Sequence, residues 1–257
     1  MKFIEFIEFI AQLESVFDPI HPSAYEGEFG YVANSEGEVA RIGFATNLSP
    51  ITAARAIETN VDGLLTHHDA WDFLYGLRIE TLKTLERASI SHGYVHLPLD
   101  AAPFGTAAAL TEGLGLQIVD SFAPVEGLPC GRIGEPSSPL PLQTVARKLR
   151  AVTGAGVRFW ECNDSEVRRI AVAPGGGNLT DVLHEAADLG CDTFVTGESA
   201  LYSVEYARYR RMNLIVGTHT QTEFPGMEHL SECLAARTGL EFIPIREDGF
   251  EIGEVLI

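Results

Sequence analysis

The chain has 257 residues, of which 46% are hydrophobic, so it is long enough for one large or two modest domains with buried cores. Its 36 acidic residues outnumber the 18 basic ones, and the formal net charge is -18. This balance disfavours nucleic acids and anionic membranes as partners, because phosphate binding requires clustered Lys and Arg. The four cysteines are widely scattered without a Cys-x-x-Cys, so no zinc ribbon is indicated and a reducing cytoplasm is expected.

An amphipathic helix is expected over residues 1–15. Phe-Ile pairs recur there every three residues, and glutamates separate them. A secretory signal would need a basic start and an uninterrupted apolar stretch, and this segment has neither. Nor does any stretch approach the length of a membrane span, so no membrane is expected as a partner.

An internal duplication follows, in which a strand–helix–strand segment occurs twice. Its four expected strands are almost entirely apolar, which is typical of strands covered on both faces: 42–45, 63–66, 170–173 and 193–196. Asp62 of the first copy corresponds to Asp192 of the second, 130 residues later, and Thr66 has its counterpart at the same spacing. A short helical crossover between two strands predicts a parallel βαβ unit in each half.

The crossover helix of the first copy is expected at residues 50–60. Ser49 is a good N-cap, and Pro50 suits the first helical position. Its counterpart in the second copy ends at Gly190, a common helix stop. A further helix is expected after each copy, at 72–87 and at 199–210.

Each half then has an apolar strand that leads into His-x-x-x-carboxylate. The pair is His96 and Asp100 in the first half, and its counterpart lies 123 residues later in the second. In open α/β sheets the functional crevice lies beyond the carboxyl ends of the strands, and the double histidine after strand 63–66 belongs there too. The sequence therefore predicts one metal site built from both halves, with six candidate ligands: His67, His68, His96, Asp100, His219 and Glu223.

Four imidazoles and two carboxylates suit two divalent transition metal ions that share a bridging group. Such mixed sites accept zinc, iron, manganese, cobalt or nickel, whereas calcium and magnesium prefer oxygen ligands. Neighbouring residues of a strand point to opposite faces, so His67 and His68 suit two metals, or a metal and a substrate, better than one metal.

Structural alternatives stay open for these residues. The double histidine can be an ordinary polar loop, and His96 can pack in the core or orient another ligand. Asp100 and Glu223 can instead cap or begin the helices expected after them, at 101–110 and 224–237.

Further positions are candidates for substrate chemistry. Glu198 corresponds to the second residue of the double histidine, so it is a candidate general base or substrate-orienting acid; a first-turn helix acid is the alternative. Asp69 competes for that role. Gly176 and Gly177 lie in the Gly-rich run 175–178, where backbone N–H groups could hold a substrate phosphate, although a plain tight turn fits equally well.

Five segments, in order and spacing, resemble the NIF-three-like dinuclear metal centre proteins, also described as GTP cyclohydrolase I type 2 homologues: 66–68, 96–103, 171–177, 192–198 and 217–223. The resemblance implies two similar, interlinked three-layer αβα domains with the metal site between them. It also implies a homo-oligomer, a toroidal hexamer whose metal sites face its interior. Its implied ligands are the six candidates above, with His96 at or near the site.

The implied activity is hydrolysis of a small, nucleotide-like substrate by a dinuclear metal enzyme. The alternative is a metal-binding ring, scaffold or regulatory protein without turnover. We expect a first half over residues 1–125, with 224–257 packing back on it, and a second half over 126–223. The chain departs from the family pattern at Asp69, where Pro is usual, at 26–30, and at 45–47, which replace a usual Asp-x-Thr.

Overall fold

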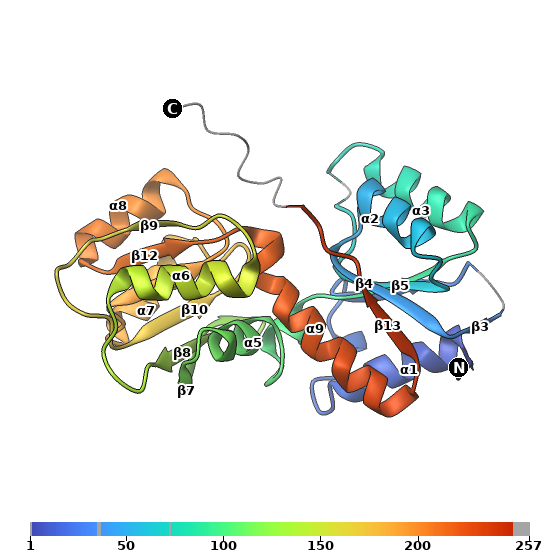
Figure 1. Cartoon of the computed structure of the whole chain (residues 1–257), viewed down its shortest axis with the longest axis horizontal. Helices are drawn as coiled ribbons and strands as arrows, with labels where there is room; N and C mark the ends of the chain where they lie inside the picture. The colour runs from blue at the N-terminus through green and yellow to red at the C-terminus, as the bar shows by residue number, and fades with distance from the viewer. Residues whose placement is uncertain (1, 35–36, 72, 249–257) are drawn as a thin grey trace. The chain divides into compact units, whose positions relative to one another are not determined.

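The computed structural model describes residues 2–34, 37–71 and 73–248 (Figure 1). Contacts between residues divide the chain into two compact units. The first contains the chain up to Ala102 together with Met227–Glu247, and the second contains Pro103–Gly226. Each unit is a mixed sheet covered by helices, so both have the α/β architecture that the sequence predicts.

The first unit is built on a five-stranded sheet with the order β13-β4-β5-β6-β2, in which β2 alone is antiparallel to its neighbour. Its strands are β2 (Phe29–Val32), β4 (Arg41–Asn47), β5 (Gly63–His68), β6 (Ser91–Val95) and β13 (Glu241–Pro244). A small ribbon pairs β1 (Ile4–Glu5) with β3 (Glu38–Val39). The helices are α1 (Phe6–Val16), α2 (Pro50–Glu58), α3 (Leu77–Arg87) and the short α4 (Leu97–Ala101), besides a 3-10 turn at Pro22–Ala24.

Helices cover both faces of this sheet (Figure 1). Leu64 of β5 packs in one cluster with Ala53 of α2 and Leu85 of α3. On the other face α1 lies against the sheet, where a Cβ at Gly93 of β6 would meet the Ile10 side chain at 3.1 Å. Alternate side chains of a strand thus pack in two different cores, one on each face of the sheet, which is why these strands are apolar throughout.

The second unit has a six-stranded sheet with the order β7-β8-β10-β11-β12-β9. Its centre is parallel, and its outer strands are antiparallel: β7 (Gln117–Val125), β8 (Leu128–Glu135), β9 (Arg158–Trp160), β10 (Ile170–Ala173), β11 (Thr193–Thr196) and β12 (Asn213–Val216). The helices α7 (Thr180–Asp188) and α8 (Leu201–Arg210) pack on one face, and α5 (Thr106–Gly113) and α6 (Leu142–Thr153) on the other. The long helix α9 (His219–Thr238) begins in this unit and continues into the first.

Both units contain the same run of elements, a parallel β-α-β-α-β, as β4-α2-β5-α3-β6 and β10-α7-β11-α8-β12. One repeated contact explains a repeated residue. Asp62 accepts backbone N–H bonds from Ala40 and Arg41, both at 2.9 Å, just where β4 begins. Asp192 accepts the equivalent bonds at 2.7 and 3.1 Å from the two residues before β10. The matching aspartates therefore fasten the first strand of each run.

The helices differ in detail from the ranges that the sequence predicts. The expected N-terminal helix is α1, which starts at Phe6 after a short strand, and α2 begins with the Ser49–Thr52 capping box. The helix expected at 101–110 starts only at Thr106, because Pro103 holds the preceding Ala102 extended, with ψ of 146°. No helix within the described ranges is both long and apolar enough to cross a membrane.

The division between the units also differs from the expected one. Residue 125 falls at the end of β7, which pairs with β8 as an antiparallel hairpin inside the second unit. The hydrogen bonds of that hairpin keep both strands in one sheet, so the first unit ends earlier, at Ala102. Of the segment 224–257 expected with the first unit, Met227–Glu247 is grouped with it, and residues 249–257 lie outside the described part of the chain.

Candidate metal centre

Three imidazoles converge in the first unit. His67 and His68 are the last residues of β5, with exposed fractions of 0% and 5%. Their ring centroids lie 4.5 Å apart, and the ring of His96, just before α4, lies 4.9 and 5.0 Å from them. One nitrogen of each ring lies within 4.8 Å of the other two. The rings are closer than strand alternation predicts. Pairing of β5 with β6 ends at Thr66, whereas pairing with β4 continues to His68.

The three rings are held in the same way, each through its Nδ1 atom. Nδ1 of His67 lies 2.9 Å from the carbonyl oxygen of Val95. Nδ1 of His68 lies 2.8 Å from Oδ1 of Asn47, and Nδ1 of His96 lies 2.5 Å from Oε2 of Glu28. An acceptor at Nδ1 places the proton there and leaves the lone pair on Nε2, which is the arrangement that metal-binding histidines require.

A buried network stands behind His68. Asn47 donates from its side-chain amide to Glu247 Oε1 at 2.8 Å, which directs Oδ1 of the amide toward the imidazole. The other oxygen of Glu247 accepts the backbone N–H groups of Thr46 and Asn47, at 3.1 and 3.0 Å. The carboxylate that fixes this ring therefore comes from the far end of the chain, just after β13.

Asp100 adds an oxygen to the three imidazoles. It lies one helical turn after His96, and its Oδ1 is 3.3 Å from Nε2 of His67. Its other oxygen is 3.8 Å from Nε2 of His96. The carboxylate thus faces the nitrogen atoms that the Nδ1 contacts leave for a ligand. Three imidazoles and one carboxylate form a donor set that suits a divalent transition metal.

The second unit repeats the His-carboxylate pair. His219 is the first residue of α9, and its Nδ1 lies 2.6 Å from Oε1 of Glu198. Its Nε2 lies 3.2 Å from Oε1 of Glu223, one turn later in the same helix and only 4% exposed. Since α9 begins at His219, Glu223 is inside the helix and does not precede it as expected. The alternative that Glu223 caps this helix is therefore wrong. Glu198 lies two residues beyond the end of β11.

Electrostatics favour a positive charge at this pair. Burial alone lowers the pKa of His219, but the carboxylates of Glu223 and Glu198 outweigh it and raise that pKa to about 11. The hydrogen bond from His219 in turn holds the pKa of Glu198 below its usual range, against the opposing effect of burial. The two carboxylates thus stabilise a positive charge at the His219 ring, which a proton supplies here. A metal ion at the same place would meet the same negative charge, together with a nitrogen and an oxygen donor.

A glycine is required beside the pair. Gly175 follows β10 with φ of +59°, and a Cβ there would lie 1.8 Å from Oε1 of Glu223 and 2.9 Å from Nε2 of His219. The N–H of Gly175 donates to Oγ1 of Thr222 at 3.0 Å. The Gly-rich run thus lets the backbone approach the pair, which is a role in the fold. That Gly176 and Gly177 hold a phosphate stays a prediction.

Comparisons with known proteins identify the family of this chain. The family model described as Duf34/NIF3 (NGG1p interacting factor 3) matches residues 5–248. The chain belongs to this family. A relative from Pyrococcus horikoshii named GTP cyclohydrolase 1 type 2 homolog is 33% identical over 229 residues, which cover 86% of this chain and 90% of the relative.

Two further matches cover most of the chain. A relative of the same name from Yersinia pestis is 31% identical over 222 residues, which cover 82% of this chain and 86% of the relative. A solved structure titled protein ybgI, of unknown function, is 25% identical with a TM-score of 0.83, and the match covers 95% of this chain and 99% of that one. The resemblance and the α/β fold expected from the sequence are thereby confirmed.

Relative to the NIF3 pattern, the structure explains two departures of this chain. Asp69, where the family usually has Pro, accepts from Arg78 Nε at 2.8 Å and from the backbone N–H of Ala70 at 2.8 Å. Asn47, in the segment that replaces Asp-x-Thr, is the residue that positions His68. Asp69 is thus engaged in a part-buried ion pair with Arg78 of α3, and its catalytic role stays a prediction.

Sequence reasoning missed the residues that orient the rings: Glu28, Asn47 and Glu247. Glu28 lies in the segment 26–30 that matches the NIF3 pattern poorly, so the mismatch itself was the available signal. Asn47 lies two residues after the expected strand 42–45 and ends the observed strand β4, at the same sheet edge as the double histidine. Glu247 has no signal in the sequence, because 200 residues separate it from its partner.

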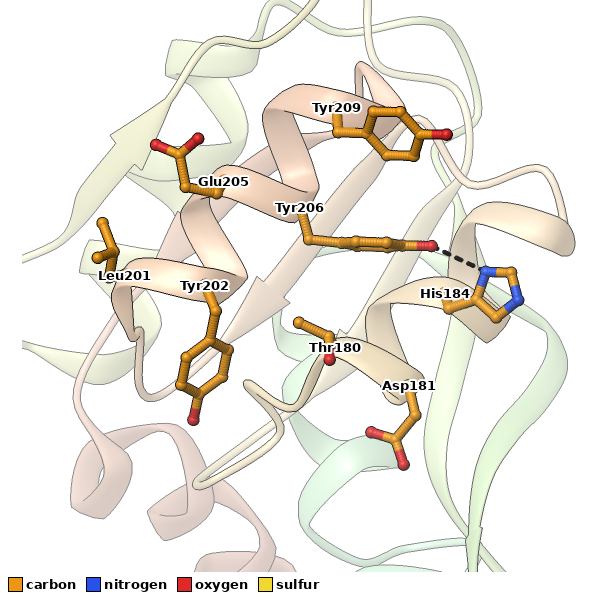
Figure 2. A pocket seen from close by; sticks show the side chains of 8 residues that line it. All are labelled: Thr180, Asp181, His184, Leu201, Tyr202, Glu205, Tyr206 and Tyr209. Atoms are coloured by element: carbon orange, nitrogen blue, oxygen red, sulfur yellow. Dashed lines mark hydrogen bonds between the residues drawn. The ribbon is translucent and has the colours of Figure 1, made fainter.

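A separate hollow lies between α7 and α8 of the second unit, with a volume of about 900 Å³ (Figure 2). Three tyrosines of α8 line it (Tyr202, Tyr206 and Tyr209), and the Tyr206 hydroxyl lies 2.8 Å from Nδ1 of His184. None of the candidate ligands or catalytic residues lines this hollow.

Proposed function

We propose that the chain is a dinuclear metal-dependent hydrolase acting on a small, nucleotide-like substrate. The observation that carries the proposal is shared by the four candidate imidazoles. Each has an acceptor within 2.9 Å of Nδ1, which leaves Nε2 for a metal ion: His67, His68, His96 and His219. Histidines with a purely structural role need not all place their acceptor at Nδ1.

The proposal assigns two divalent transition metal ions to these four imidazoles together with Asp100 and Glu223. The nitrogen and oxygen donors suit zinc, iron, manganese, cobalt or nickel. The first unit supplies four donor groups and the second supplies two, and six groups match the needs of a pair of ions that also bind water and substrate. When bound, such ions act as Lewis acids and lower the pKa of a coordinated water.

The protein's own residues then have separate tasks. Glu28 and Asn47 hold His96 and His68 in the ligand orientation, and Glu198 does the same for His219. Glu198 is half exposed and ionised at neutral pH, so its carboxylate can also accept a proton from a water. The hydrogen bond from His219 lowers its pKa and makes it a weaker base than an ordinary glutamate. Asp69 is the weaker candidate for that task, since Arg78 holds its carboxylate.

One observation supports the reaction class, and another supports the cellular compartment. The curated relatives carry the name GTP cyclohydrolase 1 type 2 homolog, and they are about 30% identical over most of both chains. None of the four cysteines, all of which the structure describes, forms a disulfide, which fits a cytoplasmic protein. We extend the proposal to the toroidal hexamer implied by the sequence resemblance; sedimentation of the metal-loaded protein tests it.

The first experiment measures metal content and turnover together. Purified protein is loaded with each candidate metal, freed of excess ion, analysed for metal per chain and screened against nucleotides, phosphoesters and cyclic amides. We expect two ions per chain and turnover of a nucleotide-like substrate. His68→Ala should abolish turnover with the fold intact, whereas His184→Ala, which removes an exposed histidine from outside both ligand sets, should keep it.

The same experiment separates the alternatives. Two bound ions without turnover across the whole screen would favour a non-catalytic metal-binding ring or scaffold. Protein that binds no ion under any loading condition would contradict both the hydrolase and the scaffold.

A further inference from the structure

The segment after the double histidine is rich in exposed aromatic rings. Trp71, Phe73 and Tyr75 have exposed fractions of 39%, 72% and 100%. They lie between β5 and α3, in a loop that ends at Gly76 with φ of +80°. Exposed apolar residues are common singly, but three aromatic residues within five positions form a patch that calls for a partner.

One end of the patch touches a candidate metal ligand. The Trp71 ring centroid lies 5.4 Å from that of His68, with 40° between the ring planes. The Phe73 ring lies 6.4 Å beyond Trp71 and is stacked on it at 29°. The rings of His68, Trp71 and Phe73 thus form a short series that leads from the buried ligand to the exposed surface.

The burial of these rings shows what they do not do. Phe73 and Tyr75 contribute almost nothing to the core, since most of their surface is exposed. Leu77, by contrast, packs against the buried cluster of the first unit at the start of α3. The fold therefore uses Leu77 to anchor this loop, and the aromatic side chains are left for another purpose.

We propose that Trp71 and Phe73 form a stacking platform for a flat heteroaromatic ring of the substrate, such as a nucleobase. This inference rests on the proposed function, because it places the ring beside the metal ligand His68. Aromatic side chains stack on every nucleobase, since each base has a π-face, and the offset geometry of Trp71 and Phe73 is the one such rings adopt. The platform would select substrates that carry a ring over sugar phosphates that lack one.

The test uses tryptophan fluorescence of the full-length, metal-loaded chain. The chain has two tryptophans, so Trp160→Phe leaves Trp71 as the sole emitter. We expect guanosine monophosphate to quench this emission with saturation, and ribose 5-phosphate at equal concentration to leave it unchanged. Phe73→Ala in this background should weaken binding of the nucleotide by about 10-fold, the usual loss when one stacking partner is removed.

Matched variants of the natural chain separate stacking from other effects. By equilibrium dialysis, Trp71→Ala should lose about 10-fold in affinity for guanosine monophosphate, and Trp71→Phe should recover most of it. Tyr75→Ala removes the fully exposed ring of the same loop and should leave affinity unchanged. Metal content is measured on the same samples and should not change in any of these variants.

The possible failures point to different conclusions. Saturable quenching by the nucleotide without turnover would keep the platform and remove the hydrolase. Turnover of a ring-bearing substrate that is unchanged in Trp71→Ala would keep the hydrolase and overturn the platform. Aromatic variants that shift the oligomeric state while nucleotide binding stays constant would also overturn it, and would assign the patch to contacts between protein chains.

Discussion

The two units place the same pair of residues at the same point of the same run of strands and helices, yet they supply different numbers of metal donors. In each, a histidine after the third strand of the run is held through Nδ1 by a glutamate and faces a carboxylate four residues on. The first unit adds the two imidazoles that end β5. At the end of β11 the second unit has Gly197 and Glu198 in their place.

This difference shows how one scaffold can serve two tasks. In the first unit the strand end supplies ligands, so this unit alone offers three imidazoles and a carboxylate. In the second unit the strand end supplies Glu198, which orients His219, so only His219 and Glu223 remain as donors. We therefore expect the first unit to retain an ion more tightly than the second, since four donor groups outnumber two.

The largest expected effect is an unequal loss of metal from variants in the two units. His67→Ala takes one of four donors from the first set and leaves three, as many protein ligands as a catalytic zinc site has, so metal content should stay above one ion per chain. Glu223→Ala leaves the first set complete, and one ion should stay bound. Metal analysis after desalting measures both, with circular dichroism as the control for folding. Equal losses in the two variants would contradict the unequal roles.

Acid should also distinguish the units. His92 in β6 is buried, and burial lowers its pKa to about 4, whereas β12 of the second unit has no histidine. The unfolded chain protonates this histidine below about pH 6.5, whereas the native chain protonates it only near pH 4. The free energy of unfolding therefore keeps the full contribution of His92 above pH 6.5 and falls by about 3 kcal/mol as the pH drops to 4.

Hydrogen exchange at decreasing pH measures this effect strand by strand. Protection of β5 and β6 should fall before that of β11 and β12. His92→Gln should remove this difference, because glutamine does not titrate. Its side-chain amide can still donate to the hydroxyl of Thr66, so the variant keeps the hydrogen bond at this position. Parallel loss of protection in both sheets would show that His92 does not set the acid stability of the first unit.

A smaller effect tests the close approach in the second unit. Gly175→Ala places a methyl group against the Glu223 carboxylate, whereas Gly154→Ala meets nothing within 4 Å at a similar φ of +67°. Both variants incur the strain of a positive φ, and the difference isolates the clash. We expect Gly175→Ala to be less stable by about 2 kcal/mol than Gly154→Ala in urea unfolding. Equal stabilities would mean that Glu223 moves aside without cost.

The smallest expected effects come from the orienting glutamates. Glu28→Gln and Glu198→Gln keep the size of the side chain and remove its charge, and each should weaken metal binding by about 10-fold, as is typical of a residue that orients a ligand. Glu205→Gln on the exposed face of α8 is the control for the change in net charge. A competitive chelator titration gives the affinities, and an unchanged affinity in Glu198→Gln would remove its orienting role.

The order of strands and helices could be predicted because it depends on local patterns. The apolar runs that became β4, β5, β10 and β11 are continuous, since each strand is covered on both faces. The Ser49–Pro50 signal located the start of α2. The range expected for α3 began too early, at 72. The helix begins at Leu77, the residue that packs on the core. Helix starts without a local cap depend on packing, which the sequence does not display.

The sequence by itself determined the parallel β-α-β-α-β run in each half and the family, because strand periodicity and residue spacing are properties of neighbouring residues. It also singled out the six candidate ligands, since they follow strands. Only the tertiary structure decided how the rings are held. Glu28 and Glu247 reach His96 and Asn47 across 68 and 200 residues, and such contacts arise from the pairing of strands in the sheet. Hydrogen bonds of that range leave no periodic trace in the chain.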